Sequence, residues 1–260
     1  MSNLSTARLM AEADGAALVK AEAAPSTLET AFAALASYQA GSSRAALLPL
    51  DEAVRACLTD AAERDKLERR LMAALNLELS PVAKEYLCGK LGLIGSAASV
   101  PVLAELLADP GLSQAARNAL EALPCPQAGQ ALRASLSKLE ALPKIGVINS
   151  IGARRDLEAV PALAQLLKDA NPRIAGAAAA ALGRIGTPGA AQVLLQFLPN
   201  APQAIQGEAA DACLASAERL LTDGNKSQAL AIYQALLDST QPKPVQASAT
   251  RGRSRAAASS

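Results

Sequence analysis

The sequence contains no histidine, and this absence narrows the chemistry open to the protein. Without an imidazole side chain, Ser-His-Asp and Cys-His nucleophile systems, histidine acid-base catalysis and histidine-ligated metal sites are excluded. A phosphate-binding loop and a dinucleotide-binding glycine fingerprint are missing too. We therefore expect a protein that is not an enzyme, with no catalytic residue, no metal site and no cofactor.

Aromatic side chains and net charge are scarce. Only 2% of the residues are aromatic and none is tryptophan, so few side chains could stack on nucleic-acid bases. The formal net charge of +1 at pH 7 gives no overall attraction to nucleic acid or to an anionic membrane. The sequence therefore does not favour a nucleic-acid partner.

Long apolar runs are also absent. Residues 1–20 show no signal-peptide pattern, and the longest uncharged run, 185–207, is interrupted by three prolines. We expect no membrane partner and a cytoplasmic location. The cysteines are far apart and form no C-x-x-C pair, which indicates free buried thiols. They are Cys57, Cys88, Cys125 and Cys213.

What the sequence does contain is alanine and leucine in helical patterns. Residues 147–186 are the clearest example, because they form two amphipathic stripes separated by one turn. Asn171 is suited to the N-cap of the second helix, Pro172 to its first turn and Gly186 to its C-terminal stop. This pattern predicts an all-α protein built from helix pairs.

The same stretch resembles a HEAT repeat of the short bacterial variety found in phycobilin-lyase-like proteins. Its matching residues are Val160, Pro161, Leu163, Leu166, Leu167, Asp169, Pro172, Ile174, Ala178, Ala181, Leu182, Gly183, Ile185 and Gly186. Ala175 departs from the pattern, since many such repeats have arginine there. The resemblance implies an armadillo-like α-solenoid, a right-handed superhelix of stacked antiparallel helix pairs.

The chain divides into three parts by this interpretation. Residues 1–24 are expected to be a helical lead-in, and 25–240 the HEAT-like solenoid with its clearest repeats at 80–215. Residues 214–238 resemble a tetratricopeptide hairpin. Residues 241–260 are expected to be a flexible tail or a repeat cut short, and an uncapped last repeat would favour self-association.

The function that the resemblance implies is a scaffold that binds a partner protein on its concave surface. The alternative is a lyase or enzyme accessory subunit of the phycobilin-lyase-like group, and a third hypothesis is DNA binding along the inner helices. Basic residues on successive turns could align along one rim and bind an acidic segment or a phosphate-bearing ligand. They are Arg154, Arg155, Lys168, Arg173 and Arg184.

Overall fold

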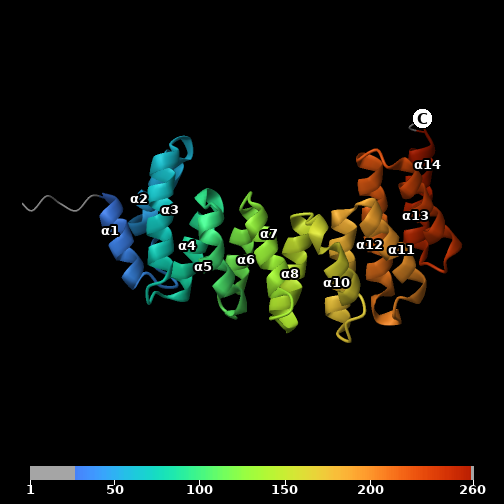
Figure 1. The fold of residues 1–260 in the computed structure, drawn as a ribbon, viewed down its shortest axis with the longest axis horizontal. Helices are drawn as coiled ribbons and strands as arrows, with labels where there is room; N and C mark the ends of the chain where they lie inside the picture. Colours follow the sequence, from blue (N-terminus) through green and yellow to red (C-terminus); the bar gives the residue numbers. More distant parts are fainter. Residues whose placement is uncertain (1–26, 259–260) are drawn as a thin grey trace, which may run out of the picture.

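The computed structural model describes residues 27–258, and these form an elongated stack of helices that follows the order of the chain from one end to the other (Figure 1). The helices are α1 (Thr27–Ala34), α2 (Leu48–Ala56), α3 (Ala61–Leu75), α4 (Pro81–Ile94), α5 (Val100–Glu105), α6 (Ser113–Ala122), α7 (Pro126–Ser135), α8 (Ala141–Ala153), α9 (Val160–Leu166), α10 (Pro172–Ile185), α11 (Pro188–Phe197), α12 (Gln206–Thr222), α13 (Lys226–Asp238) and α14 (Lys243–Ala258). No strand occurs in this part of the chain. The prediction of an all-α helical-repeat solenoid is confirmed.

Local sequence signals set the ends of these helices. Asn171 caps α10 by accepting a hydrogen bond from the Arg173 backbone N–H at 3.0 Å, and Gly186 ends the same helix in the left-handed conformation with φ +60°. Ser80 caps α4 in the same way, with Pro81 in the first turn. The turn before α10 is held by Asp169, whose carboxylate accepts from the Asn171 backbone N–H at 2.9 Å.

The helices pack in two rows. The second helices of successive pairs, α4, α6, α8, α10 and α12, contact one another in sequence, and we call them the inner row. The first helices, α5, α7, α9, α11 and α13, form the outer row and contact one another less extensively. Apolar side chains between the rows make one continuous core from α1 to α14.

Glycine against alanine allows three inner-row junctions to close tightly. A β-carbon at Gly152 would lie 2.8 Å from the Cα of Ala181, so α8 and α10 touch backbone to backbone. Gly183 meets Ala212 on α12 in the same way, and Gly92 meets Ala119 on α6. The alanine-rich face of α10 is thus a close-packing surface.

The junction between α6 and α8 is built differently. Arg117 on α6 lies across small residues of α8, where a β-carbon at Gly146 would be 2.7 Å from the Arg117 Nε. The Arg117 guanidinium also donates to the Ser150 hydroxyl at 3.3 Å. The long polar side chain of Arg117 therefore lies between α6 and α8, whereas glycine and alanine form the contact at the other three junctions.

Helix α12 begins before the first residue of the expected tetratricopeptide-like hairpin. The hairpin was expected over residues 214–238, but α12 is continuous from Gln206 to Thr222, so position 214 lies inside a helix. The turn at Gly224, with φ +81°, does separate α12 from α13. Residues 208–222 contain neither proline nor glycine, so no residue interrupts the helix at position 214.

The C-terminal segment corrects one expectation. Residues 241–260 were expected to be a flexible tail or a repeat cut short; α14 covers Lys243–Ala258 and packs on α13 and α12, so this stretch is not a flexible tail. Gly252 permits this contact, since a β-carbon there would be 2.3 Å from the ring of the buried Tyr233. The exposed side chains of α14 are mostly polar, and self-association through this end of the stack stays a prediction. The expected lead-in at 1–24 lies outside the described residues.

Candidate partner-binding surfaces

Arg154, the first of the five predicted binding residues, holds the end of a neighbouring helix. It follows α8, and its Nη1 donates to three backbone carbonyls at the end of α6, at 2.8, 2.9 and 2.6 Å. These carbonyls belong to Leu120, Glu121 and Leu123. Its Nη2 donates to the carbonyl of Cys125 at 2.9 Å. The last turn of a helix leaves such carbonyls unpaired and carries a partial negative charge, so the guanidinium caps α6.

Arg155 reaches in the other direction along the stack. Its Nε and Nη2 donate to the carbonyl of Ile185, the last residue of α10, at 3.3 and 3.1 Å. Nη2 also pairs with Asp223, which follows α12, at 3.0 Å. The backbone of Arg155 has φ +52°, a strained value for a residue with a side chain. Both arginines therefore connect repeats, and their charged groups are occupied within the chain.

The other three predicted residues are exposed but do not share one surface. Arg173 and Arg184 lie in the first and last turns of α10, in the inner row. The half-buried Ala177 and Ala180 lie between them on the exposed side of the helix. Lys168 follows α9 on the outer row. The structure therefore does not align the five residues along one rim.

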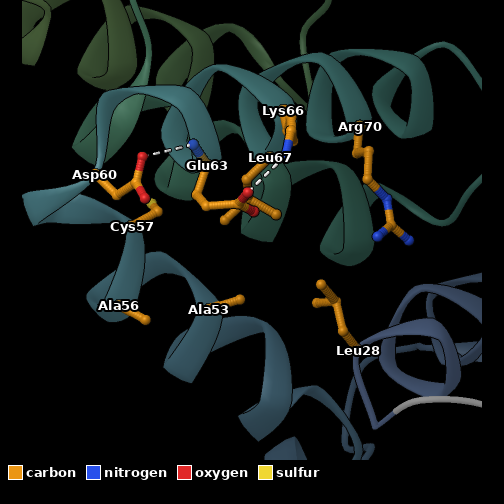
Figure 2. Close-up of a pocket in the computed structure, with 9 residues that line it drawn as sticks. All are labelled: Leu28, Ala53, Ala56, Cys57, Asp60, Glu63, Lys66, Leu67 and Arg70. Carbon is orange, nitrogen blue, oxygen red and sulfur yellow. Dashed lines mark hydrogen bonds and ion pairs between the residues drawn. The ribbon is translucent and has the colours of Figure 1, made fainter.

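A groove at the N-terminal end, with a volume of about 370 Å³, combines an apolar floor with charged walls (Figure 2). Its apolar residues include Leu28 of α1, Ala53 of α2 and the buried Leu67 of α3. Glu63 and Lys66 form one wall and pair with each other at 2.6 Å. Because the charges neutralise one another, this groove offers no strong preference for an ion of either sign.

Arg70 closes the other end of this groove. Its guanidinium lies 4.2 Å from the centre of the Phe32 ring and pairs with Glu29 at 2.8 Å. A cation over an aromatic face is held by the ring quadrupole in addition to the ion pair. The Arg70 contacts therefore fix α1 against α3 and serve the packing of the first helices.

A more apolar groove of about 480 Å³ lies between α9 and α11 on the outer row. Val193 and Phe197, both half-buried, line it together with Leu167. Lys168 lies at its edge and is its single charged lining residue.

A third groove, of about 720 Å³, lies between α12 and α14 at the C-terminal end. Leu214 and Ala215 of α12 line one side, and Arg251 and Arg255 of α14, one helical turn apart, line the other. No sequence pattern pointed to this groove, because residues 241–260 were expected to be a flexible tail or a repeat cut short. The stripe of Val245, Ala249, Gly252 and Ala256, all buried, is the signal that could have predicted the helix.

A polar cavity of about 380 Å³ lies between α7 and the segment 154–158 that precedes α9. Arg133 of α7 forms ion pairs there with Asp156 and with Glu158, the latter at 2.6 Å. Asp156 also caps the short 3-10 helix Leu157–Ala159 that leads into α9. These ion pairs connect α7 to the segment that leads into α9.

Three of the four cysteines are buried in the helix stack. Cys57, Cys88 and Cys213 are buried free thiols, whereas Cys125 is only partly buried. Burial raises the pKa of Cys88 and that of Cys213 to about 12, which keeps both thiols protonated and unreactive. Within residues 27–258, no group of histidine, cysteine or carboxylate side chains is arranged to hold a metal ion, and no helix is long and apolar enough to cross a bilayer.

The family comparison agrees with this geometry. A family model for HEAT repeats matches residues 140–214, from the start of α8 into α12. Residues 140–214 are HEAT repeats. The HEAT segment contains the Arg154 and Arg155 contacts, the Gly152 and Gly183 junctions and the exposed face of α10. HEAT repeats commonly mediate protein interactions, so a binding role suits this architecture.

Other comparisons add little to the HEAT assignment. A search of curated proteins finds no match. Among solved structures, an engineered protein is 19% identical, covers 81% of this chain and 97% of its own, and has a TM-score of 0.42. Human deoxyhypusine hydroxylase in complex with glycerol is 16% identical, covers 89% of this chain and 96% of its own, and has a TM-score of 0.38. Likeness at this level carries no conclusion about activity.

Proposed function

We propose that the chain is a non-catalytic protein-interaction module that binds a segment of a partner protein along its inner row. The observation that carries this proposal is the exposed side of α10, where Arg173 and Arg184 stand at the two ends of a strip formed by Ala177 and Ala180. The small alanines leave room for a partner backbone or apolar side chain, and the guanidinium groups can donate hydrogen bonds to carboxylates at either end.

The neighbouring inner-row helices support this proposal. Leu142 at the start of α8 is 62% exposed and Leu93 on α4 is 65% exposed, so large apolar side chains are available on the same row. The tight glycine-alanine junctions lie in the inner row, so we expect this row to be shorter than the outer row. A stack curves toward its shorter side, which makes the inner row the expected concave surface.

Pulldown from an extract of the source cells after chemical crosslinking tests this function. The native chain should recover a partner, and the double variant Arg173→Glu, Arg184→Glu should lose it. Lys168→Glu is the matched control, because it reverses a charge in the same repeat but on the outer row. The proposal would be contradicted if the native chain recovered no partner. It would also be contradicted if Lys168→Glu lost the partner while the double variant kept it.

A further inference from the structure

The α12/α14 groove has the composition of a site for an acidic peptide. We propose that it binds a protein segment whose carboxylate side chains pair with Arg251. This inference rests on the proposed interaction function and names the partner chemistry for one groove at the C-terminal end of the stack. Its evidence is the charge, the hydroxyl groups and the shape of a groove of about 720 Å³.

Arg251 is the main donor in this groove. It is exposed and lines the groove, and its Nη2 donates to the Ser248 hydroxyl at 3.2 Å. Within the described residues it forms no ion pair, so its guanidinium retains donors for a carboxylate from outside. Thr250 and Ser254 add hydroxyl groups along the same wall.

The acid already in the groove is occupied. Glu218 accepts hydrogen bonds from Arg255 and, at 2.8 Å, from the hydroxyl of the buried Tyr233. A carboxylate with these two partners offers less repulsion to an incoming acidic side chain than an unpaired one would. Glu218 and Arg255 therefore hold α14 in place, and Arg251 is left to determine the charge preference of the site.

Exposed carboxylates fix where the acidic part of a ligand can lie. Glu208 and Asp211 are exposed in the first turns of α12, whereas Leu214 and Ala215 lie next along the helix at the groove itself. An acidic segment is repelled at the start of α12 and attracted near Arg251. Its apolar side chains can contact Leu214, which is half-buried.

A peptide fits this lining better than a nucleic acid does. None of the residues that line the groove is aromatic, so bases would have no ring to stack on. Hydroxyl and guanidinium groups arranged along one helix are suited to carboxylates of an extended or helical segment. A single-stranded oligonucleotide therefore serves as a competitor class in the test.

Fluorescence anisotropy with the full chain tests the proposal. The probe is a labelled peptide of about twelve residues that repeats Asp-Glu-Leu, and the control probe repeats Asn-Gln-Leu. We expect saturable binding of the acidic probe, and a loss of about tenfold or more in Arg251→Glu, since one close charge pair of about 1.4 kcal/mol corresponds to a factor of ten.

Arg253→Glu is the matched control variant. Arg253 is on the same helix and undergoes the same charge change, but it does not line the groove and instead donates to Gln234 of α13 at 3.0 Å. Its affinity for the probe should change by less than about twofold. Both arginines are exposed, so we expect both variants to remain folded. Thermal melting followed by circular dichroism checks this.

Four outcomes would overturn the inference: no saturable binding, equal loss in both variants, equal binding of the neutral probe, or tighter binding of an oligonucleotide. The result is separable from the test of the α10 surface. If the α10 double variant loses the cellular partner while Arg251→Glu binds as the native chain does, the interaction function stands and the groove assignment fails. If only Arg251→Glu loses the acidic probe and no cellular partner is recovered, the groove stands and the α10 surface fails.

Discussion

Gly183 on α10 lies against the backbone of Ala212 on α12, so close that a β-carbon at position 183 would be 2.7 Å from the Ala212 carbonyl oxygen. The nearest atoms all belong to the Ala212 backbone, which cannot move aside as a flexible side chain can. The two helices would therefore have to move apart to admit a methyl group. Glycine at this position is therefore a requirement of packing, although glycine is a poor helix former.

Alanine at this position should destabilise the protein. We expect Gly183→Ala to lower the free energy of unfolding by about 1–3 kcal/mol, as overpacking does in a close-packed interior. Gly89 is the matched control, since it is exposed within α4 and a β-carbon there would meet nothing within 4 Å. Gly89→Ala should raise stability by about 0.5–1 kcal/mol through helix propensity. Chemical denaturation of both variants gives the comparison, and equal effects would show that the α10/α12 junction is looser than described.

Arg154 and Arg173 should behave differently although both were predicted to bind a partner. Arg154→Ala removes four hydrogen bonds to backbone carbonyls and should cost about 2–3 kcal/mol of stability. Arg173 is exposed in the first turn of α10, and Arg173→Ala should change stability by less than about 0.5 kcal/mol. Thermal and denaturant melts measure both. If Arg154→Ala leaves the stability unchanged, water forms hydrogen bonds to these carbonyls equally well.

Asp51 should contribute stability that is lost in acid. Burial raises its pKa, but hydrogen bonds from Lys90 and Tyr86, with the charges of Lys90 and Arg44, outweigh this and leave the pKa below its ordinary value of 3.8. A carboxyl group with a lowered pKa in the folded state stabilises the fold above its unfolded pKa, and that contribution disappears as the pH falls through the folded pKa.

The variant Asp51→Asn tests this pH dependence. Its difference in unfolding free energy from the native chain should be constant at neutral pH and should shrink below about pH 4. Asp65→Asn on α3, where the side chain is exposed, serves as the control and should leave the acid transition nearly unchanged. A difference that grows toward low pH would reverse the sign of the expected linkage.

The cysteines should react in a fixed order. Burial raises the pKa of Cys88 and of Cys213 to about 12 and also raises that of Cys57, so few of these thiols are ionised at pH 8. Cys125 is only partly buried and should be alkylated first. Iodoacetamide treatment at pH 8 followed by peptide mass spectrometry identifies the modified residues. Rapid modification of Cys88 in the native chain would indicate opening of α4.

The helix pairs of the HEAT segment could be predicted because their signals are local. The caps at Asn171 and Gly186 and the apolar stripes of α9 and α10 lie within one repeat, and the structure has them where the sequence indicated. The binding residues could not be predicted in the same way. Arg154 reaches carbonyls 29 to 34 positions earlier in the chain, and no pattern within its own repeat shows that its charge is occupied.

Helix α14 also depends on contacts that the local sequence does not show. Its sequence indicated a flexible tail or a repeat cut short, but Tyr233 packs against Gly252, and Glu218 pairs with Arg255 across a long sequence separation. Such contacts stabilise a helix whose composition alone would not. The right-handed superhelix and the cytoplasmic location remain predictions.

The adjacent residues Arg154 and Arg155 also affect how the stack comes apart. Repeats that contact only their neighbours can unfold one pair at a time. Here the two guanidinium groups leave the end of α8 in opposite directions, one to the carbonyls that follow α6 and the other to Ile185 and Asp223. Releasing α8 breaks bonds to α6, to α10 and to the turn after α12 together. We therefore expect the centre of the array to unfold as one cooperative unit and the outer pairs to fray first.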